Sequence, residues 1–288
     1  MSFGNILSIS VLAVATAGFA SAGPLLYDDF NYPIGQSLDG QNGGTGWASE
    51  WQGAPDLFYV AAGSLSYPNL VQSGNRAQFI QKDESSSNVV RQISSLGGDG
   101  STFWFSFLMS VDGPIGQNDA YVSLMDSLGR GDLEIGRELP DQTDWGVFSG
   151  RDNSTTPFLS SIPIVPGQDI FVAVEIDLNA NPTLNDTVNI YFDPNPATTS
   201  GAAPGVPAIT FTSYNFLSAG TTLGFDGIGA SNTPSGFVAN FDPIRGGTTY
   251  YDVAPATSST SPEPATWSFM AGGLAVLAVA VRRRATRR

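Results

Sequence analysis

The sequence contains no cysteine and no histidine among its 288 residues. Without cysteine the chain cannot form a disulfide and offers no thiolate to a metal or a substrate. Without histidine it lacks the base of Ser-His and Cys-His mechanisms and the usual zinc ligand. Of the common catalytic chemistries, carboxylate chemistry is the one that remains.

Basic residues are also few. The chain has 12 Lys and Arg against 26 Asp and Glu, a formal net charge of −14, and five of the basic residues are arginines within positions 282–288. The rest of the chain is therefore strongly acidic, and the phosphates of nucleic acids and anionic membranes would repel it. The charge predicts no nucleic-acid partner and favours divalent cations or neutral glycans.

Helical periodicity is missing from the long middle of the chain, whereas 33 Gly and 19 Pro separate short apolar runs. In Ser101 to Met109 the residues alternate, so that Phe103, Phe105 and Phe107 share one face of a strand. A 41% hydrophobic content is enough to build a core. Further strands are expected at 58–61, 89–93, 120–125, 132–135, 145–148, 170–178, 187–192, 222–225 and 237–241.

The N-terminal 22 residues have the features of a secretory signal peptide. An apolar segment from Ile6 to Ala17 precedes Ala20-Ser21-Ala22, the small-residue pattern that signal peptidase accepts. Cleavage after Ala22 would make Gly23 the mature N-terminus. The alternative, an apolar N-terminal strand, does not require such a pattern. The sequence predicts an exported protein that uses signal peptidase and the secretion machinery.

The C-terminal residues have the order of a membrane anchor. A Ser/Thr linker at 256–261 leads to Pro262-Glu263-Pro264, then to the apolar segment Ala265 to Val281 and an arginine-rich tail. Seventeen apolar residues are close to the shortest length that spans a bilayer. By the positive-inside rule the arginines would stay in the cytoplasm and the body, residues 23–255, would lie outside.

This order closely resembles the PEP-CTERM sorting signal of bacteria. The start is Pro262-Glu263-Pro264-Ala265-Thr266-Trp267, Gly272-Gly273-Leu274 lies within the helix, and Arg282 to Arg284 stand at its end. The resemblance implies that an exosortase recognises the segment, that the membrane anchor is transient, and that the protein reaches the cell surface or the exopolysaccharide matrix. A plain C-terminal anchor is the alternative.

The body resembles the concanavalin A-like and laminin-G-like jelly rolls, so an all-β, two-sheet sandwich is expected. Three groups of residues carry this resemblance. They are 27–30 with 38–47, then 171–178 paired with 186–194, and 241–250 near the end of the body. The same fold serves lectins, glycosidases and adhesion modules, so its function depends on its sites.

Glu175 and Asp177 stand two residues apart, which places both carboxylates on one face of a strand. The pattern resembles the E-x-D of laminarinase-type retaining glycosidases. Those enzymes have a second Glu shortly afterwards as acid/base, whereas Leu178, Asn179 and Ala180 follow here. The pair is therefore more typical of a polar strand face than of a catalytic site.

Two further sets of residues are candidate ligand sites. Asp28, Asp29, Asp226 and Asp242 come from segments near the two ends of the body, which lie side by side in this fold class, and their oxygens suit calcium. Turn capping is the simpler role, because no fixed calcium-loop spacing is present. Trp47 and Trp51 flank a Gly-rich stretch and could stack on sugar rings, although closing the sandwich is the simpler role for them too.

These observations favour a non-enzymatic surface or matrix protein with an acidic jelly-roll body that binds extracellular glycan or serves a structural role. No cofactor other than calcium is indicated. The alternative is a carbohydrate-active hydrolase, which would need a second carboxylate about 5 to 10 Å across a cleft from the first.

Overall fold

The structure of the protein is a computed structural model that describes residues 24–53, 55–80, 86–113, 118–125, 133–137, 142–149, 157–199, 201–214, 216, 221–228 and 236–257. Within these ranges the side chains of residues 86, 87 and 226–228 are not described. The expected signal peptide, the motif Pro262-Glu263-Pro264 and the apolar segment 265–281 lie outside the described residues. No helix among the described residues is long and apolar enough to cross a membrane.

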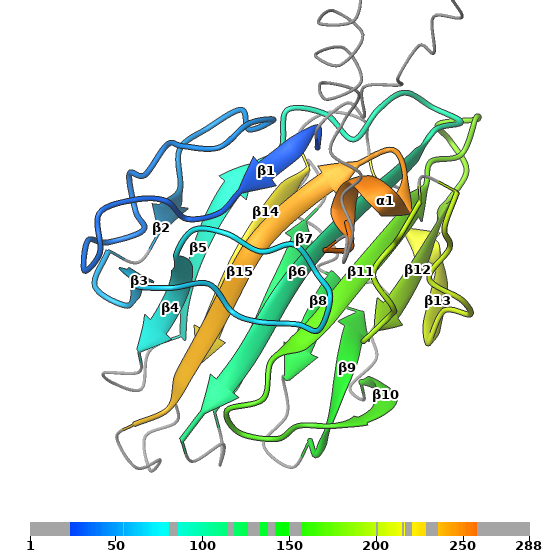
Figure 1. Cartoon of the computed structure of the whole chain (residues 1–288). Helices are drawn as coiled ribbons and strands as arrows, with labels where there is room; N and C mark the ends of the chain where they lie inside the picture. Colours follow the sequence, from blue (N-terminus) through cyan, green and yellow to red (C-terminus); the bar gives the residue numbers. More distant parts are fainter. Residues whose placement is uncertain are drawn as a thin grey trace, which may run out of the picture.

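Two antiparallel sheets form the body. The first has eight strands in the order β13-β12-β11-β6-β15-β4-β3, with β1 paired to β15. Its strands are β1 (Leu26–Asp28), β3 (Phe58–Ala61), β4 (Arg76–Ile80), β6 (Thr102–Asp112), β11 (Ile170–Asp177), β12 (Asp186–Phe192), β13 (Ile209–Tyr214) and β15 (Val238–Gly247). This sheet faces the viewer in Figure 1.

The second sheet has seven strands in the order β10-β9-β8-β7-β14-β5-β2. Its strands are β2 (Gln52–Gly53), β5 (Ser86–Gln92), β7 (Asp119–Met125), β8 (Leu133–Arg137), β9 (Asp144–Ser149), β10 (Phe158–Pro163) and β14 (Thr222–Ile228). The main core lies between the two sheets, where alternate residues of facing strands meet. Phe103, Phe105 and Phe107 of β6 pack there against Val122 and Phe225 of the second sheet.

The outer face of the eight-stranded sheet, which is turned away from the second sheet, carries a smaller apolar cluster. Trp104 and Leu108 of β6 and Phe171 of β11 belong to it. The connection between β3 and β4, residues 62–75, crosses this face, and the short helix α1 (Tyr250–Val253) lies on it (Figure 1). Both faces of β6 are therefore buried, which explains why its sequence is apolar almost throughout.

The two ends of the body lie side by side, as the sequence predicted, because Leu26 to Asp28 pair with Ile244 to Gly246. The helix α1 follows directly and starts with a capping box. Thr249 accepts from the backbone N–H of Asp252, whose carboxylate in turn accepts from the Thr249 N–H. This cap turns the chain back over the sheet after β15.

The expected all-β sandwich is confirmed, and the arrangement of the sheets is consistent with a jelly roll. The expected strands at 58–61, 120–125, 145–148 and 187–192 each lie within an observed strand. Residue 132, at the start of another expected strand, lies outside the described residues. The strands β1, β2, β4, β10 and β13 were not expected from the sequence.

Candidate functional site

A polar patch lies on the outer face where β6, β11, β12 and β13 run side by side. Glu175 of β11 stands opposite Trp104 of β6 and Asn189 of β12, and Asp177 stands opposite Thr102. Because residues directly opposite each other project on the same side of a sheet, these side chains meet on one face. The pattern that placed Glu175 and Asp177 together in the sequence also does so in the structure.

Hydrogen bonds join these side chains in two neighbouring sets, one around Glu175 and one between Thr102 and Asp177, and we name the two together the Glu175 network. Oε2 of Glu175 accepts from Asn189 Nδ2 at 2.9 Å and from the Tyr191 hydroxyl at 3.1 Å. Thr210 donates to Asn189 Oδ1 at 2.8 Å, and Thr102 donates to Asp177 Oδ1 at 2.7 Å. The network comprises Thr102, Glu175, Asp177, Asn189, Tyr191 and Thr210.

Tyr191 is fixed in its neutral form within this network. Burial raises the pKa of its phenol first, and the charge of Glu175 and the hydrogen bond to it raise the pKa further. The hydroxyl therefore keeps its proton near neutral pH and donates it to Glu175. Among the described residues, both hydrogen bonds to the Glu175 carboxylate end on Oε2.

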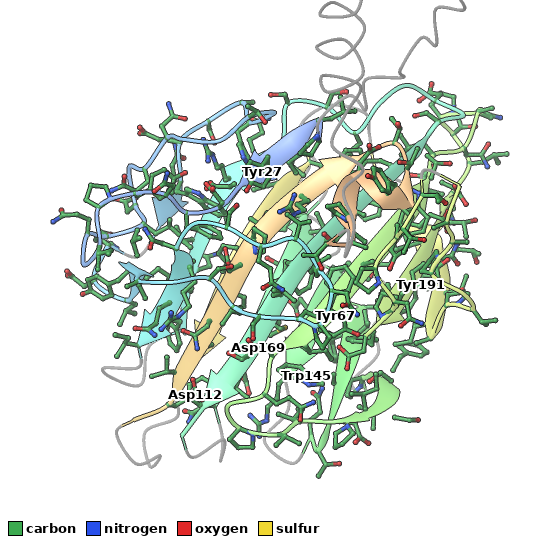
Figure 2. The ribbon with its side chains drawn as sticks, viewed as in Figure 1. Tyr27, Tyr67, Asp112, Trp145, Asp169 and Tyr191 are labelled. Carbon is green, nitrogen blue, oxygen red and sulfur yellow. The ribbon has the colours of Figure 1, made fainter. Side chains whose placement is uncertain are left out.

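Aromatic rings pack beside the network on the same face of the sheet. The Trp104 ring stacks on Tyr191 with centroids 5.7 Å apart and also contacts Tyr250 at 5.4 Å. Trp104 and Tyr191 are buried, whereas Glu175, Asp177 and Asn189 are half-buried and Thr210 is exposed. In Figure 2, Tyr191 lies on the face of the eight-stranded sheet turned to the viewer. The carboxylates thus reach water while their supports are held rigid.

Asp28 lies on the opposite, core side of the same sheet and is 1% exposed. Its Oδ2 accepts from Arg91 Nη1 at 2.8 Å, from the Tyr32 hydroxyl at 2.7 Å and from Trp51 Nε1 at 3.0 Å. Its Oδ1 accepts from the Phe30 N–H. Both oxygens of the carboxylate already accept hydrogen bonds from protein donors, so its role is structural.

The other aspartates that the sequence suggested for calcium lie elsewhere. Asp242 is fully buried under residues 64–65, where its Oδ2 accepts from the Ser64 hydroxyl and the Leu65 N–H. Burial raises its pKa to about 8, and the nearby Asp29 charge adds to the shift. Asp226 belongs to β14 of the second sheet, and its side chain is not described.

The Asp28 carboxylate lies on the core side of the sheet, whereas Asp242 lies on the outer face with residues 64–65. The structure therefore does not bring these two carboxylates together. Within the described ranges, no group of three acidic side chains is placed to hold a metal ion. The turn-capping role considered from the sequence fits Asp28, whereas Asp226 and Asp242 lie within the strands β14 and β15. Asp28 caps the Phe30 N–H within its own turn.

The two tryptophans proposed for sugar stacking belong to the core. Trp51 is fully buried and stacks on Phe225 at 5.1 Å, so a sugar ring could not reach it in this structure. Trp47 is half-buried against the same core, and the Arg91 guanidinium lies 4.8 Å from its ring centroid. Closure of the sandwich, the simpler role considered from the sequence, matches both positions.

Sequence reasoning missed the partners of Glu175, above all Asn189 and Tyr191. The signal was present, because residues 171–178 and 186–194 had been paired as neighbouring strands. Only the register decides that Asn189 stands opposite Glu175, and register depends on which faces are buried.

Comparison with known proteins gave structural matches only. No family model matches the sequence, and no curated protein matches it. An alginate lyase solved in complex with alginate tetrasaccharide superposes with a TM-score of 0.48 at 12% identity, covering 78% of this chain and 97% of that chain. An endo-β-1,4-glucuronan lyase from the fungus Trichoderma reesei gives 0.44 at 12% identity, covering 77% and 99%. A GH43 glycoside hydrolase gives 0.46 at 15% identity, covering 82% and 42%.

These comparisons contradict the sequence-based prediction of a non-enzymatic surface or matrix protein, because the matched structures are polysaccharide lyases and a glycoside hydrolase. At identities of 12 to 15% the likeness concerns the fold, so the chemistry has to be argued from this protein's own side chains.

Proposed function

We propose that the body is a carbohydrate-active enzyme and that the Glu175 network is its candidate active site. The observation that carries this proposal is a half-exposed carboxylate pair, Glu175 and Asp177, held on one sheet face by buried aromatic and amide supports. An acid held rigidly at a surface that water and a flat ligand can reach is what glycoside cleavage requires.

The spacing of the pair suits hydrolysis. Residues two apart on a strand are about 6.6 Å apart, and the two carboxyl groups of glycosidases are separated by about 5 to 10 Å. We propose Asp177 as the second acidic group; it lies beside Glu175 on the same strand, whereas the laminarinase pattern has a further glutamate on the other side of the bond. Tyr191 and Asn189 orient the Glu175 carboxylate by holding Oε2, so that Oε1 is available to a substrate.

The location of the enzyme is part of the proposal and is supported by the sequence. The pattern Ala20-Ser21-Ala22 after an apolar segment supports export, and Pro262-Glu263-Pro264 before the segment 265–281 supports sorting by an exosortase at the cell surface. Replacing Pro262-Glu263-Pro264 by alanines in an exosortase-bearing host should leave insertion intact and stop processing. An unchanged mass and membrane partition would show that the tail is only an anchor.

The activity can be tested with residues 23–261, which contain every described strand of both sheets. Purified protein is incubated with a panel of neutral, amino and uronic polysaccharides, and new reducing ends are measured. Glu175→Gln should lower the rate on any cleaved polysaccharide by about 10² to 10⁴. The control, Asp56→Asn, alters an exposed loop carboxylate ahead of β3 and should leave the rate unchanged.

Three outcomes would contradict the proposal or part of it. If the wild-type protein cleaves nothing in the panel, the enzyme assignment is wrong. If Glu175→Gln retains the full rate, cleavage takes place at another site. Products with unsaturated ends would indicate elimination instead of hydrolysis, and would refute the role of the carboxylate pair in hydrolysis.

A further inference from the structure

All four arginines that the structure describes make their contacts away from the Glu175 network. Three of them are buried. Arg76 and the buried Arg245 are on the outer face, but β6 separates the strand of Arg245 from β11, and β15 and β6 separate the strand of Arg76 from it. Arg76 donates to the Ala62 and Gly63 carbonyls. Of the three buried arginines, Arg91 contacts Asp28 and Arg137 contacts Asp119. Arg245 contacts the Tyr27 ring and donates to the Val71 carbonyl.

Further acidic groups lie on the same outer face, beside the start of β11 and the end of β12. Asp193 follows Tyr191 by two residues, and its charge helps to raise the pKa of Tyr67 to about 12, after burial. Asp169 accepts from the Ser66 N–H at 2.7 Å in the connection that crosses the same face. Tyr67, Asp169 and Tyr191 all lie on the viewer's side of the sheet in Figure 2. The potential over this face is therefore negative.

The internal segments outside the described residues do not reverse this balance. They contain three basic residues, Lys82, Arg130 and Arg151, against seven acidic ones. A polysaccharide with a carboxylate on every sugar would meet like charge along the whole face. Clefts lined by one sign of charge attract the opposite sign and disfavour their own.

We propose that the Glu175 site acts on glycans whose sugars carry no acidic group, either neutral or amino-bearing, and that it discriminates against polyuronates. The inference rests on the proposed function, and it sets this protein apart from the alginate and glucuronan lyases whose fold it shares. The substrate would be held by hydrogen bonds to half-exposed carboxylate and amide groups, and none of the four described arginines contacts these groups.

Matched polysaccharide pairs test this inference, because they differ only in charge. The wild-type body is assayed on short, soluble oligosaccharides of β-1,4-glucuronan and on the β-1,4-gluco-oligosaccharides made by reducing their carboxyl groups, and likewise on alginate oligosaccharides and their carboxyl-reduced forms. The reduced member of a pair should be cleaved about tenfold faster or more at low salt. The ratio should shrink between about 0.01 M and 1 M salt, where the screening length falls from about 30 to about 3 Å.

Thr212 offers a variant that changes charge without touching the network. It is exposed on the same face of β13, two residues from Thr210. Thr212→Lys should raise the rate on glucuronan about two- to threefold relative to the reduced glucan, because a cation then lies beside the site. Thr212→Gln, which is similar in length but neutral, should leave the ratio where it was.

Each result is decisive. Faster cleavage of the reduced members, with a salt-sensitive ratio, supports the inference. Equal cleavage, or faster cleavage of the uronate members, overturns it and leaves the proposed enzyme function intact. Cleavage of no member of either pair and of nothing in the wider panel overturns the proposed function, and this inference with it. If only other neutral or amino glycans in the panel are cleaved, the substrate class is confirmed.

Discussion

The eight-stranded sheet holds an acidic group on each of its two faces, and the two differ in how their charge is treated. On the core side, Asp28 is 1% exposed and is matched by the Arg91 guanidinium and three further donors. On the outer side, Glu175 has neutral donors and faces water. A buried charge needs a partner of opposite sign, whereas a half-exposed one does not.

The comparison teaches that the acidic residue with the most partners is the one whose contacts are all structural. Asp28 was one of four candidate calcium ligands in the sequence, yet every contact it makes holds the core together. Glu175 was judged to be an ordinary strand residue because no second glutamate follows it. Its position on an accessible and rigidly supported face makes it the better candidate.

The largest expected effect comes from breaking the ion pair on the core side. Arg91→Met leaves the Asp28 carboxylate buried without its counter-charge and should lower the free energy of unfolding by about 3 to 5 kcal/mol. Urea unfolding at neutral pH measures the loss. Arg76→Met, at a part-exposed arginine that contacts carbonyls, should cost about 1 kcal/mol and is the matched control. A loss below about 1 kcal/mol for Arg91→Met would show that the pair does not hold the core together.

The next effect concerns the turn that encloses Asp28. Gly44 has φ +74°, and a Cβ there would lie 2.0 Å from the Tyr27 carbonyl oxygen. Gly44→Ala should therefore cost about 2 to 3 kcal/mol of unfolding free energy, from backbone strain and from displacement of β1. Gly40 has a similar φ of +81° with nothing within 4 Å, so Gly40→Ala should cost only about 1 kcal/mol. Equal losses would mean that the contact with Tyr27 relaxes freely.

Sequence alone predicted the strands whose alternation is strong and missed those whose signal is short. In β6 the repeated phenylalanines marked the core face correctly, and the pairing of β11 with β12 was expected. The strand β4, Arg-Ala-Gln-Phe-Ile, was missed because only two of its residues face the core. The helix α1 was missed because a four-residue helix has too few residues to show a period.

The functional site was harder to predict, for a physical reason. The face on which Asp28 lies is set by the register of β1 against β15, with Tyr27 opposite Arg245, and no local pattern fixes that register. For Glu175 the face was predictable, but the supports from Asn189, Tyr191 and Trp104 depend on two strand pairings at once.

A smaller effect is expected from Asp242, which lies on the outer face like Glu175 but is fully buried. Its pKa is raised to about 8 in the folded protein, chiefly by burial, whereas it is near 3.8 when unfolded. The folded state therefore binds more protons between these values, and stability falls as the pH rises from about 4 to about 8. Asp119, whose pKa burial raises to about 7, adds to the same slope.

Asp242→Asn removes the titrating group and keeps an oxygen for the Ser64 and Leu65 donors. The fall in unfolding free energy between pH 5 and pH 9 should shrink by roughly 1 to 2 kcal/mol, because local relaxation and water entry reduce the cost of charging a buried carboxylate. Urea unfolding at the two pH values gives the comparison. An identical pH slope in the variant would show that Asp242 is not the group that titrates.

The smallest expected change in stability belongs to Glu175 itself. Glu175→Gln keeps an oxygen that accepts from Asn189 and Tyr191, stays half-exposed, and removes a charge that lies two residues from Asp177. The loss of one carboxylate–donor interaction and the relief of repulsion nearly cancel. The free energy of unfolding should therefore change by less than about 0.5 kcal/mol in either direction.

The same chemical change at Asp28 provides the contrast. Asp28→Asn places an amide against the buried Arg91 guanidinium and should cost about 3 kcal/mol or more, because the guanidinium then stays buried without its counter-charge. If both variants are measured by urea unfolding and by cleavage of the best polysaccharide, Asp28→Asn should lose stability and keep its rate per folded molecule. Glu175→Gln should keep its stability and lose its rate. A Glu175→Gln protein that unfolds as readily as Asp28→Asn would place both acids in the same structural role and remove the argument for a site on the outer face.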